Sequence, residues 1–308
     1  MSIPKRIFYV WGANEEKRRD VELCLLTWKQ ICPEYQIIEI NEESTEYFDF
    51  EKELKNNKWF KTIYENKLYA YISDYVRIKV LYDNGGIYLD TDVSLLKNFD
   101  EFIEERAFVG IQRSSSMGTS NLEPAILGAE KNNPIIKQIL DFYNENIWKQ
   151  PIYTIPSIFD YVLEKNYGEI FYPEKSEQQI IKLENITLYP ERFFIPFRYG
   201  ETFSLDCIEH ETVSIHWFGG SWVKSNIKYF LQNKHKEDLR KLLKKCFGTK
   251  NIICNDFLNI NRTFLKYNIN IDLSFIFKFK YKYYDNNRYL TVYILGWQIR
   301  LFKTGEQK

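Results

Sequence analysis

The 308-residue sequence has almost no excess of charge of either sign, because 42 lysines and arginines balance 42 aspartates and glutamates. It therefore lacks the basic surplus on which bulk electrostatic binding of nucleic acids depends, and we expect no nucleic-acid partner. Long apolar runs are also missing, since none approaches the ~20 residues of a membrane span. Met1 leads almost directly into a predicted strand, so we expect no signal peptide.

Cysteine and histidine are scarce as well. The five cysteines are odd in number and contain no Cys-x-x-Cys pair, which argues against a zinc cluster or a disulfide framework and favours a cytoplasmic setting. Of the three histidines, only His216 follows an apolar run. What the chain does contain is apolar residues (44%), many of them aromatic (17%), enough for one large α/β domain with or without an appendage.

The most informative stretch runs from residue 73 to residue 92. A helix predicted over residues 68–83 is followed by Asn84-Gly85-Gly86, which supplies the left-handed conformation that ends a helix. A short β-prone run at 87–89 then leads to Asp90 and Asp92. Strand residues two apart point to the same side, so both carboxylates leave the strand together. Such a pair suits Mg²⁺ or Mn²⁺, which can hold a diphosphate.

The order of the predicted elements indicates a nucleotide-binding α/β fold. A strand at 6–11, a helix at 15–31 and a strand at 36–40 predict a right-handed parallel crossover. The remaining predictions are short surface helices within 45–66, a strand at 108–111, a loop at 113–119, a helix at 134–148 opened by proline, strands at 187–194 and 213–217, and a helix at 234–247.

Residues 73–92 resemble the signature of the DXD-containing sugar-binding glycosyltransferases, glycosyltransferase family 32, whose catalytic core is shared with the large clostridial glucosylating toxins. Three more segments are similar to family elements and occur in the expected order: IPKRIFYVW at 3–11, CPEY at 32–35 and IHWFGGSW at 215–222. The resemblance implies a GT-A-type, Rossmann-like nucleotide-sugar-binding fold over residues 1–248, followed by a small C-terminal appendage at 249–308.

The resemblance also implies a role for each candidate site residue. The residues implied for catalysis are Asp74, Arg77, Asp90 and Asp92. Those implied to bind the Mn²⁺ or Mg²⁺ ion are Asp90, Asp92, His216 and Ser221. Those implied to bind the donor are Val10, Trp11, Asp74, Arg77, Tyr88, Asp90, Ser221 and Trp222. Asp74 would accept hydrogen bonds from sugar hydroxyls, and Arg77 would contact the sugar or a phosphate.

Simpler structural roles compete with some of these assignments. Asp74 and Arg77 share a helix face, so an exposed intrahelical ion pair is the alternative to the role in sugar recognition, which is favoured. Trp11 would stack on the base of the donor or belong to the core, and burial is also open for Tyr88. The family's Gly-Pro is represented here by YTIPS at 153–157, without the glycine, so no acceptor residue is assigned there. The loop at 114–121 is a candidate instead.

The implied activity is retaining transfer of a hexose from a nucleotide-diphosphate sugar, with a UDP-linked donor favoured, to a glycan or lipid-linked glycan acceptor. Two alternatives remain open. A metal-dependent phosphatase or phosphotransferase would also use an Asp-x-Asp motif, and a catalytically silent module would bind the nucleotide-sugar without transfer. A donor-hydrolysis assay with and without metal distinguishes all three.

After residue 248 the composition shifts toward Asn, Lys, Tyr and Phe. Lys278, Lys280 and Lys282 alternate with aromatic residues within 275–284, so in a strand they would form one cationic face, and 289–302 is a second β-prone run. This tail is either a structural appendage or a surface that rests on anionic lipid. The second alternative favours a bacterial enzyme at the inner face of the cytoplasmic membrane, acting on lipopolysaccharide or capsule.

Overall fold

The computed structural model describes residues 2–112, 121–173, 175–199, 201–218, 234–236 and 241, and, as backbone only, the strands at 277–284, 287–294 and 297–304. The chain divides into two compact units, Met1–Phe247 and Gly248–Lys308, and each is described by itself. The roles predicted for the two segments, a catalytic domain and an appendage, stay predictions. Within the described residues, we find no helix that combines the length and apolar character needed to cross a bilayer.

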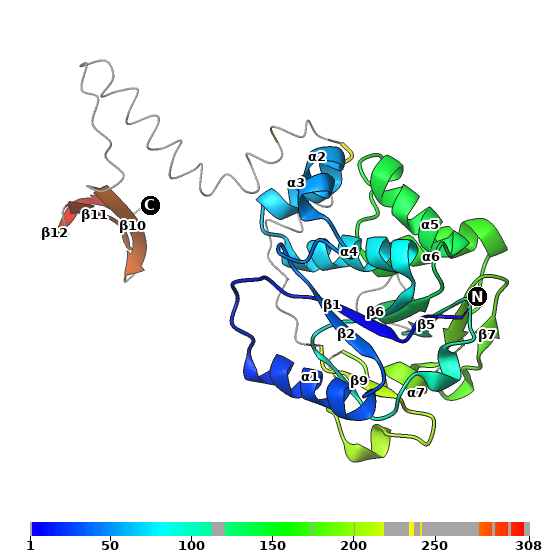
Figure 1. Cartoon of the computed structure of the whole chain (residues 1–308). Coiled ribbons are helices and arrows are strands. Elements are labelled where there is room, and N and C mark those ends of the chain that lie inside the picture. The colour runs from blue at the N-terminus through cyan, green and yellow to red at the C-terminus, as the bar shows by residue number, and fades with distance from the viewer. Residues whose placement is uncertain are drawn as a thin grey trace. The chain divides into compact units, whose positions relative to one another are not determined.

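A seven-stranded mixed sheet forms the centre of the first unit, with strand order β2-β1-β3-β6-β5-β8-β7 (Figure 1). Its strands are β1 (Arg6–Val10), β2 (Gln36–Ile40), β3 (Gly86–Leu89), β5 (Ala107–Ile111), β6 (Leu122–Ala129), β7 (Ile181–Lys182) and β8 (Thr187–Tyr189). All run in one direction except β6 and β7, which are antiparallel to their neighbours. The predicted α/β class with a mostly parallel sheet is therefore confirmed.

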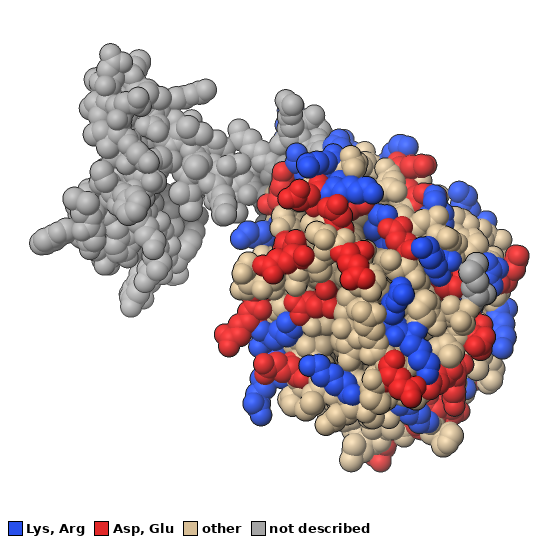
Figure 2. Space-filling model, viewed as in Figure 1, with Lys and Arg blue, Asp and Glu red and all other residues tan. Residues whose placement is uncertain are grey.

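Helices cover both faces of this sheet (Figure 1). One face carries α2 (Phe50–Asn56), α3 (Lys58–Glu65), α4 (Tyr69–Asn84), α5 (Pro134–Asp141) and α6 (Ile155–Tyr167); the other carries α1 (Arg19–Ile31), α7 (Glu191–Phe194) and the small two-stranded sheet of β4 (Val93–Leu95) and β9 (Ser214–His216). Each layer encloses its own apolar core. The surface outside these cores bears interspersed acidic and basic side chains on the face that Figure 2 shows, in keeping with the balanced net charge.

The predicted crossover at the N-terminus is confirmed, since β1 and β2 pair in parallel on either side of α1. The helix begins at Arg19, later than predicted, because polar contacts hold the preceding residues in a loop. The indole Nε1 of Trp11 donates to the carbonyl of Glu15 at 2.7 Å, and the Lys17 ammonium lies 2.6 Å from the Glu39 carboxylate.

The glycine turn that follows α4 is also confirmed. Gly85 has φ 67° and Gly86 has φ 132°, both in the region that favours glycine. A Cβ atom on Gly85 would lie 2.7 Å from the backbone nitrogen of Lys131, and one on Gly86 would lie 2.9 Å from the ring of Phe8. Both positions thus require glycine, and the turn delivers the chain into β3 at the centre of the sheet.

Two predicted boundaries are wrong. The run at 187–194 is not one strand: β8 ends at Tyr189, and α7 begins at Glu191. Pro190 separates them because it has no N–H for the strand ladder and its fixed φ suits the start of a helix. The helix predicted over 134–148 begins at Pro134 as expected but ends at Asp141, where a π-helical turn, Phe142–Asn146, takes over.

Strand β6 has no counterpart among the predicted elements. Its sequence, LEPAILGA, contains proline, glycine and two alanines, which are poor strand formers. It forms because it lies between β3 and β5, and a register irregularity at Val109/Gly110 of β5 accommodates the region of Pro124. Burial on both faces outweighs its low intrinsic strand preference.

The second unit contains an antiparallel meander of β10 (Phe277–Tyr284), β11 (Asn287–Ile294) and β12 (Trp297–Thr304). The β-prone run at 289–302 is divided between β11 and β12. Leu295-Gly296 lies between them in the sequence, and a glycine in so short an interval is a hairpin signal. The predicted loop at 113–119 lies outside the described residues, as does almost all of the helix predicted at 234–247.

Candidate active site

Asp90 and Asp92 follow β3 at the sheet edge where β1 and β3, which are parallel, both end. The backbone there is fixed on two sides. The N–H of Asp90 donates to the carbonyl of Ala125 in β6 at 2.8 Å, and the N–H of Val93 donates back to the carbonyl of Asp90 at 3.1 Å. Both carboxylates therefore start from a rigid turn rather than from a loose loop.

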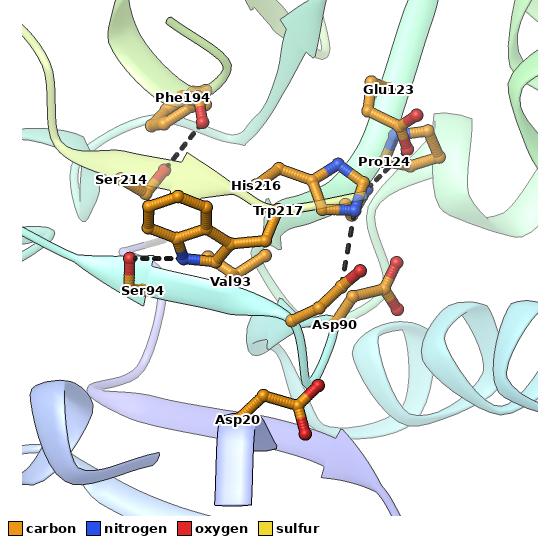
Figure 3. Close-up of polar contacts among 12 residues, drawn as sticks. Asp20, Asp90, Val93, Ser94, Glu123, Pro124, Phe194, Ser214, His216 and Trp217 are labelled. Carbon is orange, nitrogen blue, oxygen red and sulfur yellow. Dashed lines mark hydrogen bonds and ion pairs between the residues drawn. The ribbon is translucent and has the colours of Figure 1, made fainter. Parts of the chain in front are cut away.

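His216 joins these carboxylates through the pairing of β4 with β9. The ladder places Val93 opposite His216, and the N–H of Trp217 donates to the carbonyl of Asp92 at 2.9 Å. The imidazole Nε2 lies 3.3 Å from the Asp92 carboxylate (Figure 3 shows His216 and Asp90 together). One ligand atom from each of Asp90, Asp92 and His216 lies within 4.8 Å of the others, so the three can share a single ion.

The chemistry of this donor set fits a divalent metal. Two carboxylates and one imidazole are ligands that Mn²⁺ accepts readily, and Mg²⁺ favours the carboxylates. Burial opposes a charged imidazole, but the hydrogen bond to Asp92 and the charges of Asp92, Glu123 and Asp90 together raise the pKa of His216 to about 9. The ring thus resides among negative charges that a cation would neutralise. Its other nitrogen, Nδ1, is buried and has no hydrogen-bond partner in the described part of the chain.

Arg77 lies beneath the carboxylates and is almost wholly buried, with 4% of its side chain exposed. Its guanidinium is 2.9 Å from Asp90 and 3.1 Å from Asp74, and it donates to the carbonyl of Pro124 at 2.6 Å. An exposed intrahelical ion pair is therefore the wrong description of Asp74 and Arg77. Arg77 orients Asp90, and burial raises the pKa of Asp90 although the guanidinium opposes this.

Asp74 connects the site to the start of α6. Burial raises its pKa to about 7, against the opposing effect of Arg77. The backbone N–H of Ile155 donates to its carboxylate, and the nearby ring of Tyr153 lies 6.5 Å from that of Tyr71. The segment at 153–157, in which no acceptor residue was assigned, thus contacts Asp74, the residue predicted to bind the donor sugar.

The other predicted donor residues differ in their accessibility. Tyr88 is only 1% exposed, and its ring lies under the Arg77 guanidinium at 4.5 Å, so it supports Arg77 from below. Val10 and Trp11 are half-buried at the end of β1, beside the carboxylates, and the Lys17 ammonium lies 6.0 Å from the Trp11 ring centre. Ser221 and Trp222, and the candidate loop as far as Ser120, lie outside the described residues.

Glu123 is a site residue that the sequence did not indicate (Figure 3). It lies in β6 next to Pro124 and Ala125, whose carbonyls hold Arg77 and Asp90. Burial raises the pKa of Glu123. The positive charges of His216 and Arg77 oppose this rise, and the negative charge of Asp90 adds to it. Since β6 itself was not predicted, no local pattern could have placed this carboxylate in the site.

Residues 19–109 match the family model described as a glycosyltransferase sugar-binding region containing a DXD motif. This range includes Asp74, Arg77, Asp90 and Asp92, and the resemblance stated from the sequence is confirmed. The sheet described above confirms the α/β class, and the match agrees with the GT-A type that the resemblance implies.

Two curated proteins are similar to parts of this chain. Inositol phosphoceramide mannosyltransferase 3 of Schizosaccharomyces pombe is 31% identical over 143 residues, 45% of this chain and 36% of its own length. An uncharacterized glycosyltransferase of Acanthamoeba polyphaga mimivirus is 30% identical over 89 residues, 28% of this chain and 35% of its own length. The chain thus spans about a third of the length of either relative. Both relatives are named as glycosyltransferases, in agreement with the predicted class of enzyme.

Solved structures of glycosyltransferases are also similar. The PaToxG glycosyltransferase aligns with 22% identity and a TM-score of 0.43, over 54% of this chain and 70% of its own. A glycosyltransferase involved in glycosylation of the major capsid of PBCV-1 aligns with 13% identity and a TM-score of 0.39, over 70% of this chain and 94% of its own. Because both TM-scores are below 0.5, nothing about substrate or mechanism follows from them.

Proposed function

We propose that this chain transfers a hexose from a nucleotide-diphosphate sugar, with UDP as the favoured nucleotide, to a glycan acceptor. The observation that supports this most is the convergence of Asp90, Asp92 and His216 at one point, within a chain whose sugar-binding region matches a glycosyltransferase family. A bound Mn²⁺ or Mg²⁺ would supply charge stabilisation for the departing diphosphate. Ser221 is proposed to complete this site.

The residues around the cluster divide into those that hold the carboxylates and those that face the donor. Arg77, with Tyr88 below it, fixes Asp90 and Asp74. Asp74 and Glu123 are carboxylates that would repel a diphosphate, so we assign them to the hydroxyls of the donor sugar, which donate hydrogen bonds to carboxylates. Trp11 is proposed to stack on the base, and Trp222 to close over the glycosidic oxygen.

The reaction is proposed to retain the anomeric configuration by attack from the same face as the leaving group, with the departing diphosphate accepting the acceptor's proton. The test uses the full chain with a panel of UDP- and GDP-sugars, with Mn²⁺ or Mg²⁺ and with EDTA. We expect metal-dependent release of nucleotide from one donor. Proton NMR of the transfer product, with the anomeric proton resolved, should show retention, and an inverted product would exclude same-face attack.

Sugar recognition is expected to depend on Asp74 and Glu123 more than nucleotide binding does. Asp74→Asn and Glu123→Gln should each weaken binding of the UDP-sugar about tenfold, because a charge-assisted hydrogen bond to a hydroxyl is lost, and should change UDP affinity little. Isothermal titration calorimetry in the presence of Mn²⁺ measures both affinities.

The matched control for this pair of variants is Asp83→Asn, on the exposed side of α4, where the carboxylate binds Lys79. It should alter neither affinity. Equal losses for UDP and for the UDP-sugar in Asp74→Asn or Glu123→Gln would show that these residues shape the whole site and do not recognise the sugar.

For the acceptor we propose a lipid-linked glycan. The fission-yeast relative is named as a mannosyltransferase for inositol phosphoceramide. In the second unit, Lys278, Lys280 and Lys282 pair with Tyr293, Thr291 and Tyr289 of β11, and paired antiparallel positions share a face of the sheet. Arg300 and Lys303 of β12 pair with that same row. These basic positions suit the anionic surface of a membrane.

A cytoplasmic bacterial setting, with lipopolysaccharide or capsule as the product, stays a prediction, and the curated relatives are fungal and viral.

Membrane contact is expected to depend on the basic row of β10. Replacing Lys278, Lys280 and Lys282 together by Gln should weaken binding to anionic vesicles about a hundredfold, at ~1 kcal/mol per charge. Co-sedimentation with phosphatidylglycerol vesicles measures this, and high salt should weaken the wild-type binding too. Replacing Lys52, Lys55 and Lys61 of α2 and α3 by Gln removes the same charge and should have no such effect. Equal losses of vesicle binding in the two triple variants would show that residues 249–308 are an appendage without a membrane role.

A further inference from the structure

Five aromatic residues next to His216 form one continuous cluster, which we call the aromatic platform: Phe197, Tyr199, Phe203, Trp217 and Phe218. The ring of Phe203 lies 5.0 Å from that of Trp217 and 5.5 Å from that of Phe197, and the Phe218 ring is 5.5 Å from Phe197 and 6.0 Å from Tyr199. Most of these contacts are edge-to-face, the arrangement in which aromatic rings attract one another. The rings therefore fix each other's orientation.

The aromatic platform is held rigidly against the proposed metal site. Trp217 follows His216 directly, its N–H donates to the carbonyl of Asp92 at 2.9 Å, and its indole Nε1 donates to the hydroxyl of Ser94 at 2.9 Å. The Phe218 ring is 4.3 Å from the His216 ring. Phe218 has φ 53°, a left-handed conformation that a bulky residue rarely adopts. Backbone strain of this kind persists where the surroundings impose it, and it concentrates at functional sites.

Part of the aromatic platform is open to solvent, unlike the aromatic residues of the two cores. Tyr199 is 56% exposed and Trp217 is 42% exposed. The polar end of the indole is already satisfied by Ser94, so what Trp217 offers to a ligand is its ring surface. The exposed polar residues Glu201 and Thr202 follow Tyr199 in the sequence, and exposed Ser204 follows Phe203. The short segment that carries Tyr199 and Phe203 therefore also bears exposed hydroxyl and carboxylate groups.

We propose that the aromatic platform binds a pyranose ring of the acceptor glycan, an inference that rests on the proposed function. A pyranose has an apolar face of C–H groups and a rim of hydroxyls, and it matches exposed rings bordered by polar groups. An alkyl chain matches this surface less well, because it would place apolar groups against the polar residues. The position also fits, because the acceptor hydroxyl has to reach the sugar held beside Asp90, Asp92 and His216, and the platform begins at the residue after His216.

The experiment measures two quantities on the full chain with methyl glycosides of glucose, galactose, mannose and N-acetylglucosamine. Saturation-transfer-difference NMR reports glycoside binding without catalysis, and the ratio of glycosyl transfer to donor hydrolysis reports acceptor use. Trp217→Leu and Tyr199→Leu keep an apolar side chain but remove the flat ring, and each should lower both the NMR signal and the ratio about tenfold. Trp217→Phe and Tyr199→Phe keep a ring and should retain most of both. Phe171→Leu is the control, since Phe171 is 81% exposed and takes no part in these ring contacts.

A fall in the ratio confined to the leucine variants supports the proposal. An unchanged ratio and unchanged NMR signals in Trp217→Leu and Tyr199→Leu would overturn it, and so would equal losses in the leucine and phenylalanine variants. If the wild-type chain hydrolyses no donor, the proposed function fails, but the NMR signals still decide whether the aromatic platform binds sugar.

Discussion

Asp90→Asn and Asp92→Asn are each expected to lower metal-dependent donor hydrolysis by about a thousandfold, because each removes one anionic ligand from the site that would stabilise the leaving diphosphate. Asparagine keeps an oxygen for Arg77 at position 90 and for His216 at position 92, so the local hydrogen bonds survive. The alanine variants should lose activity to at least the same degree. Initial rates of nucleotide release with saturating Mn²⁺ measure the effect, and circular dichroism shows that the fold persists.

Two comparisons make this prediction specific. Asp141→Asn removes a half-buried carboxylate that binds Lys137 on α5, away from the proposed site, and its rate should equal that of the wild type. EDTA should bring the wild-type rate down to the level of the Asp90→Asn and Asp92→Asn variants. Undiminished hydrolysis in EDTA would remove the metal from the mechanism, whatever the variants show.

Arg77→Met is expected to destabilise the fold by about 3–5 kcal/mol and to abolish activity. The substitution removes a buried cation and leaves Asp74 and Asp90 without compensation, and breaking a buried pair from one side costs this much. For a domain of this size, the melting temperature should fall by roughly 10 °C. Urea unfolding followed by circular dichroism measures the stability. A loss below about 1 kcal/mol would show that the buried carboxylates do not depend on Arg77.

A second substitution separates the charge effect from the loss of packing. Adding Asp74→Asn to Arg77→Met removes one of the stranded carboxylates, so the double variant should be more stable than the sum of the single effects predicts. Arg18→Met removes an exposed guanidinium that binds only Asp20 among the ion pairs described, and it should change stability by less than about 0.5 kcal/mol. Additive effects of Arg77→Met and Asp74→Asn would contradict the coupling.

Much of the fold follows from local sequence patterns. The helix at α4, the glycine turn and the pair Asp90 and Asp92 could be predicted because their periodicity and backbone requirements act within a few residues. The parallel crossover of β1, α1 and β2 followed from the order of elements alone. The boundaries at Pro190 and Asp141 were placed less well, because short apolar runs suit a strand or a helix until tertiary contacts choose between them.

The sequence by itself determined the α/β class, and it indicated Asp90, Asp92 and the candidate residues around them. Only the tertiary structure decided what each candidate touches. It brought His216 to Asp92 through β4 and β9, buried Arg77 and Tyr88 under the carboxylates, and added Glu123 from β6. The physical reason is that burial and charge pairing depend on residues distant in the sequence. A local pattern specifies which residues share a face, and the neighbouring strands and helices decide whether that face meets solvent or the interior.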